Sequence, residues 1–184
     1  MELREQYGGI GLVIILAKKI ESWAFRLKRI TSFLNPWEDI RGDSWQIVQS
    51  LYAIGSGGLF GTGLGASKQK YMYIPEPHND FIFAIVAEEL GFIGCLVVIV
   101  LFAIFIWRGV LIAIKAPDMY GSLLAGGITA LIGMQAIINI AVVTSSIPVT
   151  GMALPFFSYG GTSLIILLCS VGILFNIGRQ GNKL

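Results

Sequence analysis

The sequence predicts an all-α integral membrane protein. Of its 184 residues, 55% are hydrophobic and only 13% are charged, whereas about a quarter of the residues of a soluble domain are charged. Residues 119–178 contain no charged side chain and no histidine, which is enough for two bilayer-crossing helices of about 20 residues each. We expect about three full transmembrane helices, a partial N-terminal helix and a long extracellular loop that contains an amphipathic helix.

The charge balance and the cysteine count exclude other classes of protein. Thirteen basic and eleven acidic residues give a net charge of +2, so no strong positive field draws the chain to nucleic acid. The two cysteines, Cys95 and Cys169, both lie in apolar runs, where a buried free thiol is the usual state. Together with the single histidine they are too few to form a zinc site.

Residues 1–30 form the first predicted segment. The apolar run over residues 8–17 ends at Lys18 and Lys19, and it is too short to cross the bilayer by itself. Aromatic and aliphatic side chains then alternate with cations up to residue 30, which is typical of a helix at the membrane surface. We expect a partial or interfacial helix, with a full span as the alternative.

Residues 31–78 form the second predicted segment, a large extracellular loop. Asn35 and Pro36 indicate a helix start, since asparagine caps well and proline fits the first turn. An amphipathic helix is expected further along the loop, because apolar residues recur there at helical spacing. Its predicted apolar face comprises Ile47, Val48, Leu51, Tyr52 and Ile54, and its polar face comprises Gln46, Gln49 and Ser50.

Residues 55–65 are rich in glycine. No Gly-Lys-Ser/Thr follows them, and the run does not lie between a strand and a helix, so neither nucleotide-binding motif is supported. We expect a flexible, tightly packed loop. Lys68 and Lys70 follow it beside two tyrosines, and two interpretations remain open. The lysines form an interfacial belt that extends to the head groups, or they bind the phosphate or diphosphate of a lipid.

Residues 79–184 form the third predicted segment, which holds the transmembrane helices. The expected spans are residues 79–107, 122–144 and 161–178. The connection between the last two spans is apolar but is broken by Pro148 and Pro155. Because irregular backbone at membrane depth must be covered by protein or line a cavity, we expect this connection to be partly re-entrant.

The positive charges predict an orientation. Arg108 and Lys115 lie between the first two spans, and Arg179 and Lys183 follow the last one, whereas the connection at residues 145–160 has no cation. By the positive-inside rule, the C-terminus faces the cytoplasm. The connection and the long loop then face outward.

Asp80 and His78 are candidate site residues where the loop meets the first span. Asp80 can cap the helix, or it can act as a general base at the outer membrane surface. His78 is by default a loop histidine, and its functional alternative is a hydrogen bond to Asp80 or to a substrate phosphate.

Glu88 and Glu89 follow on the same predicted helix, about 12–14 Å beyond Asp80. Carboxylates within a span are costly and usually face a cavity or a cation. Neighbouring helical positions point in different directions, so the two glutamates need different partners. Gln135 and Asn139 share one face of the next helix, where we expect them to form interhelical hydrogen bonds.

Several long motifs resemble the SEDS family (shape, elongation, division, sporulation), and the FtsW and SpoVE branch is the most similar. The motifs are YIPEPHNDFIFA at residues 73–84, AEELGFIG at 87–94, IPVTG at 147–151 and LPFFSYGGTS at 154–163. Asn139, Ile140 and Val143 belong to the same resemblance. It covers about residues 30–179.

This resemblance implies a peptidoglycan glycosyltransferase of the bacterial cytoplasmic membrane. Such enzymes have about ten transmembrane helices, polymerise lipid II at the outer face, and pair with a class B penicillin-binding protein that crosslinks the strands. The family's large extracellular loop corresponds to residues 31–78, and its essential aspartate falls on Asp80. Only the last three helices and a remnant of another are matched here, so we expect the chain to be a C-terminal part.

The implied chemistry assigns a role to each candidate residue. The 4-hydroxyl of N-acetylglucosamine attacks carbon 1 of a muramoyl unit that carries a lipid diphosphate. Asp80 is the expected base, and Lys68 and Lys70 are expected to stabilise the leaving group, with a divalent cation as a further candidate. The expected substrate-binding residues are Lys68, Lys70, His78, Glu88 and Glu89.

Two alternatives remain open at this stage. A lipid II flippase would account for the glutamates within a span. The other alternative is an inactive, truncated membrane scaffold that only packs against a partner.

Overall fold

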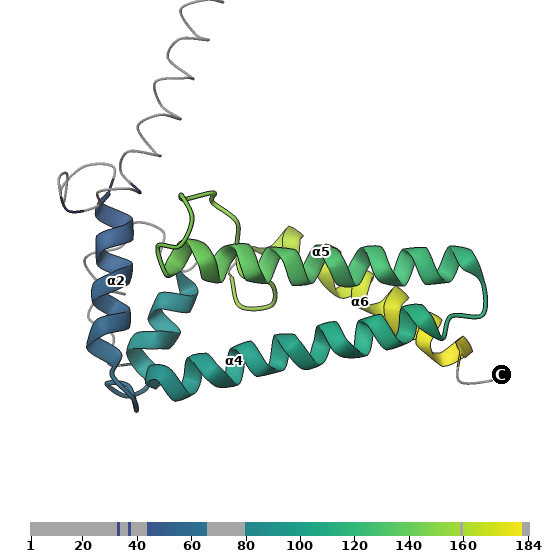
Figure 1. Cartoon of the computed structure of the whole chain (residues 1–184), viewed down its shortest axis with the longest axis horizontal. Coiled ribbons are helices and arrows are strands. Elements are labelled where there is room, and N and C mark those ends of the chain that lie inside the picture. Colours follow the sequence, from purple (N-terminus) through teal and green to yellow (C-terminus); the bar gives the residue numbers. More distant parts are fainter. Residues whose placement is uncertain (1–32, 34–36, 38–43, 66–79, 159, 182–184) are drawn as a thin grey trace, which may run out of the picture. The chain divides into compact units, whose positions relative to one another are not determined.

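The computed structural model of the chain consists of helices and the segments that join them. It describes residues 33, 37, 44–65, 80–158 and 160–181. The helices are α2 (Trp45–Gly57), α4 (Ile82–Ile114), α5 (Met119–Val143) and α6 (Gly161–Gly181) (Figure 1). No strand occurs among the residues that the structure describes. α4, α5 and α6 are long and apolar enough to cross a membrane, which confirms the predicted all-α membrane fold.

Several predictions fall on residues that the structure does not describe. They concern the segment 1–30, the helix start at Asn35 and Pro36, and the side chains of Lys68, Lys70 and His78. Residues from Gln46 onward form one compact unit, which is described here by itself.

α2 confirms the predicted helix, but its buried face differs from the predicted one. Ser50 is fully buried and Gln49 is 6% exposed, whereas Tyr52 is 50% exposed. The Ser50 hydroxyl donates to the Ile47 carbonyl at 2.7 Å and lies 3.2 Å from the carbonyl of Val143 in α5. A small hydroxyl that is satisfied in this way can be buried, so the helix packs through part of its predicted polar face.

α4 is broken at Gly91, which has φ 68° and ψ −164°, and Figure 1 shows the sharp bend there. A straight helix of 33 residues would be about 50 Å long, well beyond a hydrocarbon core of about 30 Å. Residues 92–114 alone extend about 34 Å, which is enough for one crossing. The single span predicted over residues 79–107 is therefore interrupted, and residues 82–90 form a separate short segment before the bend.

The bend frees two backbone carbonyls, and the glycine-rich loop binds both. In an unbroken helix, the carbonyls of Glu88 and Glu89 would accept from the N–H groups four residues later. Instead, the N–H of Thr62 donates to the Glu88 carbonyl at 2.9 Å, and that of Gly63 donates to the Glu89 carbonyl at 3.1 Å. The hydroxyl of Thr62 also donates to the Glu88 carbonyl, at 3.0 Å.

The same loop accepts the N–H groups that the bend releases. Phe92 donates to the Gly58 carbonyl at 2.9 Å, and Ile93 donates to the Leu59 carbonyl at 3.3 Å. The two segments thus exchange backbone hydrogen bonds at the bend. Close packing within residues 55–65 is found at Gly57 and Gly61, which lie against the backbone of α4, whereas a Cβ on Gly55, Gly58, Gly63 or Gly65 would meet nothing within 4 Å.

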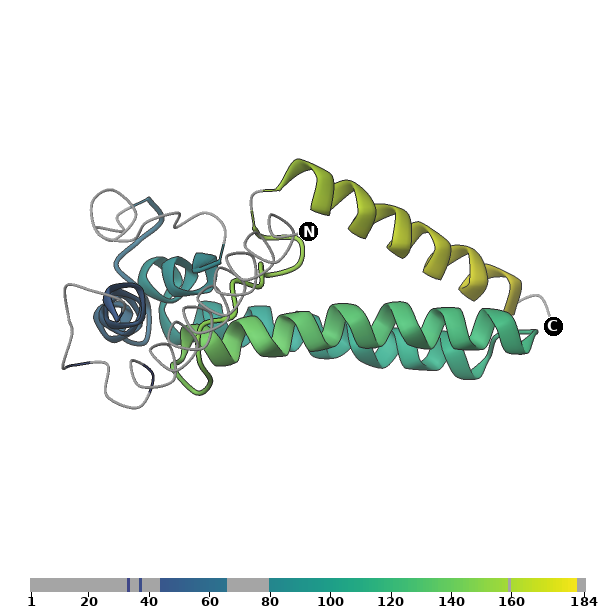
Figure 2. The same cartoon turned by 90° about the horizontal axis from the view of Figure 1, so that it is seen from above.

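α4 and α5 pack through small side chains. The second half of α4 and α5 run side by side in both views (Figures 1 and 2). A Cβ on Gly109 of α4 would lie 2.6 Å from the Thr129 methyl group in α5, so no larger residue fits there. Small buried residues recur every four positions along α5, which lets helix backbones approach closely in a membrane. They are Gly121, Ala125, Thr129 and Gly133.

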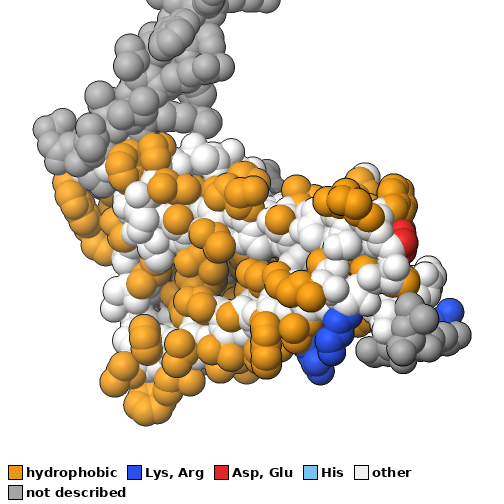
Figure 3. Space-filling view, turned by 45° about the vertical axis from the view of Figure 1, so that its right-hand side comes forward, with side chains coloured by type: hydrophobic (Ala, Val, Ile, Leu, Met, Phe, Trp, Pro, Cys, Tyr) orange, Lys and Arg blue, Asp and Glu red, His pale blue; other side chains and the backbone are white. Residues whose placement is uncertain are grey.

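α6 contacts the other two helices mainly through its second half. Its buried residues are Leu174 and Ile177, and Figure 2 shows α6 separated from α4 and α5 at its start and meeting them near its end. A Cβ on Gly178 would lie 3.2 Å from the Ile112 side chain. Much of the surface in Figure 3 is apolar, and such a surface must be covered by lipid or by other protein.

Candidate functional site

Asp80 lies directly before α4 and is held by two other segments. The N-cap position of α4 falls on Phe81, whose side chain makes no capping hydrogen bond, so Asp80 lies one residue before the position predicted for it. The Asp80 carbonyl accepts from Nδ2 of Asn139 in α5 at 2.8 Å. Its Oδ2 lies 3.5 Å from the position that a Cβ on Gly151 would take. α5 therefore holds the backbone of Asp80, and Gly151 of the connection after α5 lies near its carboxylate.

Asn139 ties three segments together at this end of the helices. It is 1% exposed, and its Nδ2 donates both to Asp80 and to the carbonyl of Met152, the latter at 2.6 Å. The sequence predicts interhelical hydrogen bonds for Asn139, but its amide donates instead to backbone carbonyls of the segments before α4 and after α5. Its Oδ1 is buried without a hydrogen-bond partner among the described residues.

The connection between α5 and α6 folds back deep between the helices. The ring centroid of Phe156 lies 6.5 Å from that of Phe102 and 5.9 Å from that of Phe105, both on α4. These two residues lie about 16 and 21 Å along α4 from Gly91, which is more than half of a core of about 30 Å. The connection therefore folds back along α4, which is the course that a partly re-entrant connection would take.

A closed turn at the tip satisfies the backbone of this connection. The N–H of Leu154 donates to Oγ of Ser158 at 2.8 Å, and the N–H of Ser158 donates to the Leu154 carbonyl at 3.1 Å. Leu154 is 1% exposed and anchors the turn in the core. Non-helical backbone at membrane depth needs such internal pairing.

An apolar cavity of about 620 Å³ opens beside this turn. Its lining residues are Ile82, Phe156, Phe157, Ser158, Gly160, Gly161 and Leu164. Ile82, the second residue after Asp80, lines the cavity, whereas Asp80 itself is not among its lining residues. A smaller space of about 50 Å³ is lined by Gln135, Ser158 and Ser163 among others, and it shares Phe156, Ser158 and Leu164 with the larger cavity. The apolar lining of the larger cavity suits a hydrocarbon chain.

Glu88 and Glu89 lie in the short segment before the bend, and their surroundings differ. Glu88 is 3% exposed. Oε1 of Glu89 is buried and has no hydrogen-bond partner among the described residues. The backbone carbonyls of both residues accept hydrogen bonds from the glycine-rich loop, a role that their sequence pattern did not predict.

Other predicted site residues remain untested by the geometry. Lys68, Lys70 and His78 are not described, so their approach to Asp80 stays a prediction. Within the described part of the chain, no three His, Cys, Asp or Glu side chains gather as metal ligands would, and the divalent cation also stays a prediction. Sequence reasoning missed Gly91 as a bend, although an isolated glycine in an apolar helical pattern is a recognised signal.

Comparison with known proteins identifies the family. Residues 5–183 match the family described as cell cycle proteins FtsW, RodA and SpoVE. The chain is 57% identical over 172 residues to stage V sporulation protein E of Bacillus subtilis (strain 168), covering 94% of this chain and 45% of that protein. It is 49% identical over 174 residues to a probable peptidoglycan glycosyltransferase FtsW of Geobacter sp. (strain M18), covering 94% and 47%.

Two solved structures of similar fold support the same family. One, described as structural coordination of polymerization and crosslinking by a peptidoglycan synthase complex, matches with a TM-score of 0.66 and 31% identity, covering 84% of this chain and 41% of that one. The rod shape determining protein RodA of Thermus thermophilus matches with a TM-score of 0.54 and 35% identity, covering 71% and 38%. The chain spans a little under half the length of the curated relatives named above. By its sequence and its fold, the chain belongs to the family of FtsW, RodA and SpoVE cell cycle proteins.

Proposed function

We propose that this chain is the C-terminal part of a lipid II polymerase that builds peptidoglycan strands at the outer face of the cytoplasmic membrane, during division or sporulation. The names of the relatives support the reaction class. The observation that carries the proposal is the placement of Asp80. Its backbone is fixed by Asn139, its carboxylate lies beside Gly151, and an apolar cavity begins two residues further on.

The proposed step is a glycosyl transfer. The 4-hydroxyl of N-acetylglucosamine attacks carbon 1 of the muramoyl unit, a new C–O bond forms, and the bond from carbon 1 to the lipid diphosphate breaks. Asp80 takes the hydroxyl proton, which is the work of a general base. Lys68, Lys70 and His78 stabilise the negative charge of the departing diphosphate, with a divalent cation as a candidate that would add to this charge.

The re-entrant connection gives the lipid part of the substrate a place to bind. The cavity beside Phe156 and Phe157 is apolar and lies near the helix end that carries Asp80. A polyprenyl chain in this cavity would bring its diphosphate to the membrane surface near Asp80. Apolar walls with a few polar groups at one end are typical of sites for amphiphilic ligands.

Two further features complete the proposal. The partner is a class B penicillin-binding protein, which is in keeping with the solved synthase complex in which polymerization and crosslinking are coordinated. The C-terminus lies in the cytoplasm, because the cations Arg108, Lys115 and Arg179 gather at the end of the helices away from Asp80.

The test uses a chimera in which this chain replaces the matching half of the Bacillus subtilis relative. The chimera is reconstituted with a class B penicillin-binding protein and labelled lipid II, and glycan strands are separated on gels. Asp80→Asn should lower the polymerisation rate by about 10²–10⁴-fold without changing the melting temperature.

The matched control is Asp118→Asn. Asp118 is a true N-cap, whose Oδ2 accepts from the Gly121 N–H at 2.9 Å, and asparagine caps nearly as well. The Asp118→Asn chimera should therefore retain its polymerisation activity. Normal strand synthesis by the Asp80→Asn chimera would exclude Asp80 as the general base. If the unchanged chimera translocates lipid II without making strands, a flippase is favoured. If it does neither, a scaffold is favoured.

A further inference from the structure

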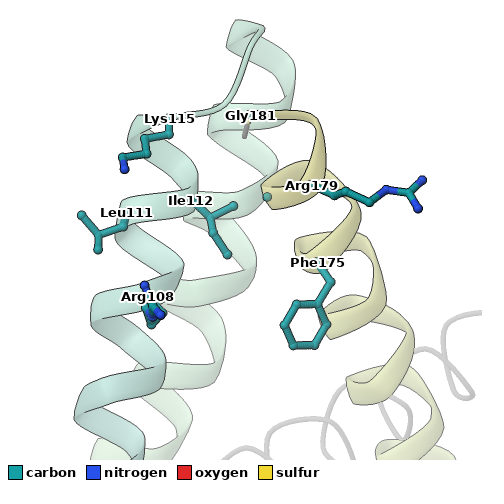
Figure 4. A pocket seen from close by; sticks show the side chains of 8 residues that line it. Arg108, Leu111, Ile112, Lys115, Phe175, Arg179 and Gly181 are labelled. Atoms are coloured by element: carbon teal, nitrogen blue, oxygen red, sulfur yellow. The ribbon is translucent and has the colours of Figure 1, made fainter. Parts of the chain in front are cut away.

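A second cavity, of about 400 Å³, lies between α4 and α6 at the far end of α4 from Asp80 (Figure 4). Its lining residues are Arg108, Leu111, Ile112, Lys115, Phe175, Gly178, Arg179 and Gly181. In Figure 4, Ile112 of α4 and Phe175 of α6 face the space between the two helices. The side chains of Lys115, at the end of α4, and of Arg179, in the last turn of α6, extend outward on opposite sides of this space. The cavity therefore has an apolar interior and a cationic rim.

The three cations of this rim have no acidic counterpart among the described residues. Asp118 is the described carboxylate nearest in sequence, and its Oδ2 is used to cap α5. Figure 3 shows two separate groups of Lys and Arg side chains toward this end of the largely apolar surface, together with one acidic side chain. Uncompensated positive charge beside an apolar wall attracts an anion that carries a hydrocarbon part.

Helix-end electrostatics explains only part of this arrangement. Cations in the last turn of a helix are stabilised by its dipole, which accounts for Lys115 and Arg179. It does not account for Arg108, which lies nearly two turns before the end of α4 and is exposed on the cavity side. A charge that deep toward the hydrocarbon normally has a counter-charge nearby.

We propose that this cavity binds an anionic phospholipid from the leaflet at this end of the helices. The phosphate lies at the rim of the cavity, where Arg108, Lys115 and Arg179 are found, and an acyl chain lies along Phe175 and Ile112. A phospholipid fits better than a covering protein segment, because one molecule supplies both the anion and the hydrocarbon chain at the depth where the helices leave the membrane. The proposal does not depend on polymerase activity or on which leaflet is cytoplasmic.

The test measures which lipid stays bound to the chain. The chain is reconstituted in nanodiscs with equal amounts of phosphatidylglycerol and phosphatidylcholine, released into mild detergent, and examined by native mass spectrometry. We expect retained phosphatidylglycerol to exceed phosphatidylcholine. Each cation should contribute about fivefold, so the Arg108→Ala, Lys115→Ala, Arg179→Ala triple variant should lose the preference.

Two controls make the outcome decisive. Arg108→Lys with Arg179→Lys keeps all three charges and should keep the preference. Removing three cations from the N-terminal segment, at Lys18, Lys19 and Arg26, lowers the net charge equally and should leave the preference intact. Equal retention of both lipids by the unchanged chain, or an equal loss in the N-terminal variant, would overturn the proposal.

Discussion

Gly61 and Gly91 pack backbone against backbone, and both have positive φ angles, 79° and 68°. A Cβ on Gly91 would fall 2.7 Å from the Leu59 carbonyl and against the N of Gly61. A Cβ on Gly61 would meet the carbonyl carbon of Glu89 at 2.5 Å. Only glycine combines this conformation with this approach, so the bend in α4 and the docked loop depend on each other.

Gly91→Ala should therefore destabilise the chain. Strain at positive φ and overpacking each cost about 1–3 kcal/mol, so we expect a loss of about 2–4 kcal/mol, measured by thermal unfolding in detergent. Gly172→Ala is the matched control, because Gly172 lies in α6 and a Cβ there meets nothing within 4 Å. Equal stability of the two variants would contradict the proposed dependence.

Asn139→Ala should disconnect Asp80 from the re-entrant connection. The change leaves the part-buried carbonyls of Asp80 and Met152 without their donor, which costs up to about 1–3 kcal/mol per unsatisfied group. We expect lower stability and slower polymerisation by the chimera. Asn176→Ala, which removes an exposed amide from α6, should change neither quantity. If Asn139→Ala is also neutral, the amide does not position Asp80.

Replacement of Glu88 and Glu89 by Gln should have unequal effects in this chain. Glu88 is 3% exposed, and a carboxylate persists in such a place only with compensating interactions. Glu88→Gln is thus expected to cost about 1–3 kcal/mol. Oε1 of Glu89 is buried without a partner among the described residues, so Glu89→Gln should be neutral or stabilising. Denaturation curves that show equal losses would contradict this asymmetry.

Single cysteines test the proposed orientation. In a background without Cys95 and Cys169, Leu64→Cys and Thr150→Cys should react with a membrane-impermeant thiol reagent added to intact cells. Pro117→Cys should react only after the membrane is opened, because the positive-inside rule places it in the cytoplasm. All three positions are exposed in the structure, so access to the reagent depends on sidedness. Labelling of Pro117→Cys from outside would reverse the orientation.

The loop lysines should affect the use of substrate more than folding. Lys68→Ala with Lys70→Ala should raise KM for lipid II in the chimera, and Glu at both positions should be worse, because a diphosphate would then face negative charge. The melting temperature should stay constant. Unchanged kinetics for both variants would favour the interfacial belt instead.

Part of the candidate site follows from residue types alone. A carboxylate where a loop meets a span, and an asparagine on an apolar helix, are costly unless they have a function or a partner, so Asp80 and Asn139 stand out in the sequence. Their link did not follow, since the amide of Asn139 bonds the backbone carbonyls of Asp80 and Met152. Every residue has a backbone carbonyl, so the sequence does not indicate which carbonyl will accept a given hydrogen bond. The N-cap position expected at Asp80 falls instead on Phe81, because the helix starts one residue later.

The sequence by itself determined the membrane class, the number of spans and the family, because the thickness of the hydrocarbon core fixes how long an apolar run must be. Tertiary structure decided where α4 bends, which face of α2 is buried and how deep the connection at residues 145–160 reaches. These features depend on hydrogen bonds and ring contacts between segments far apart in the chain. An apolar pattern in the sequence indicates whether a side chain lies in an apolar environment. It does not indicate which backbone N–H group will replace a hydrogen-bond donor that the helix loses at a bend.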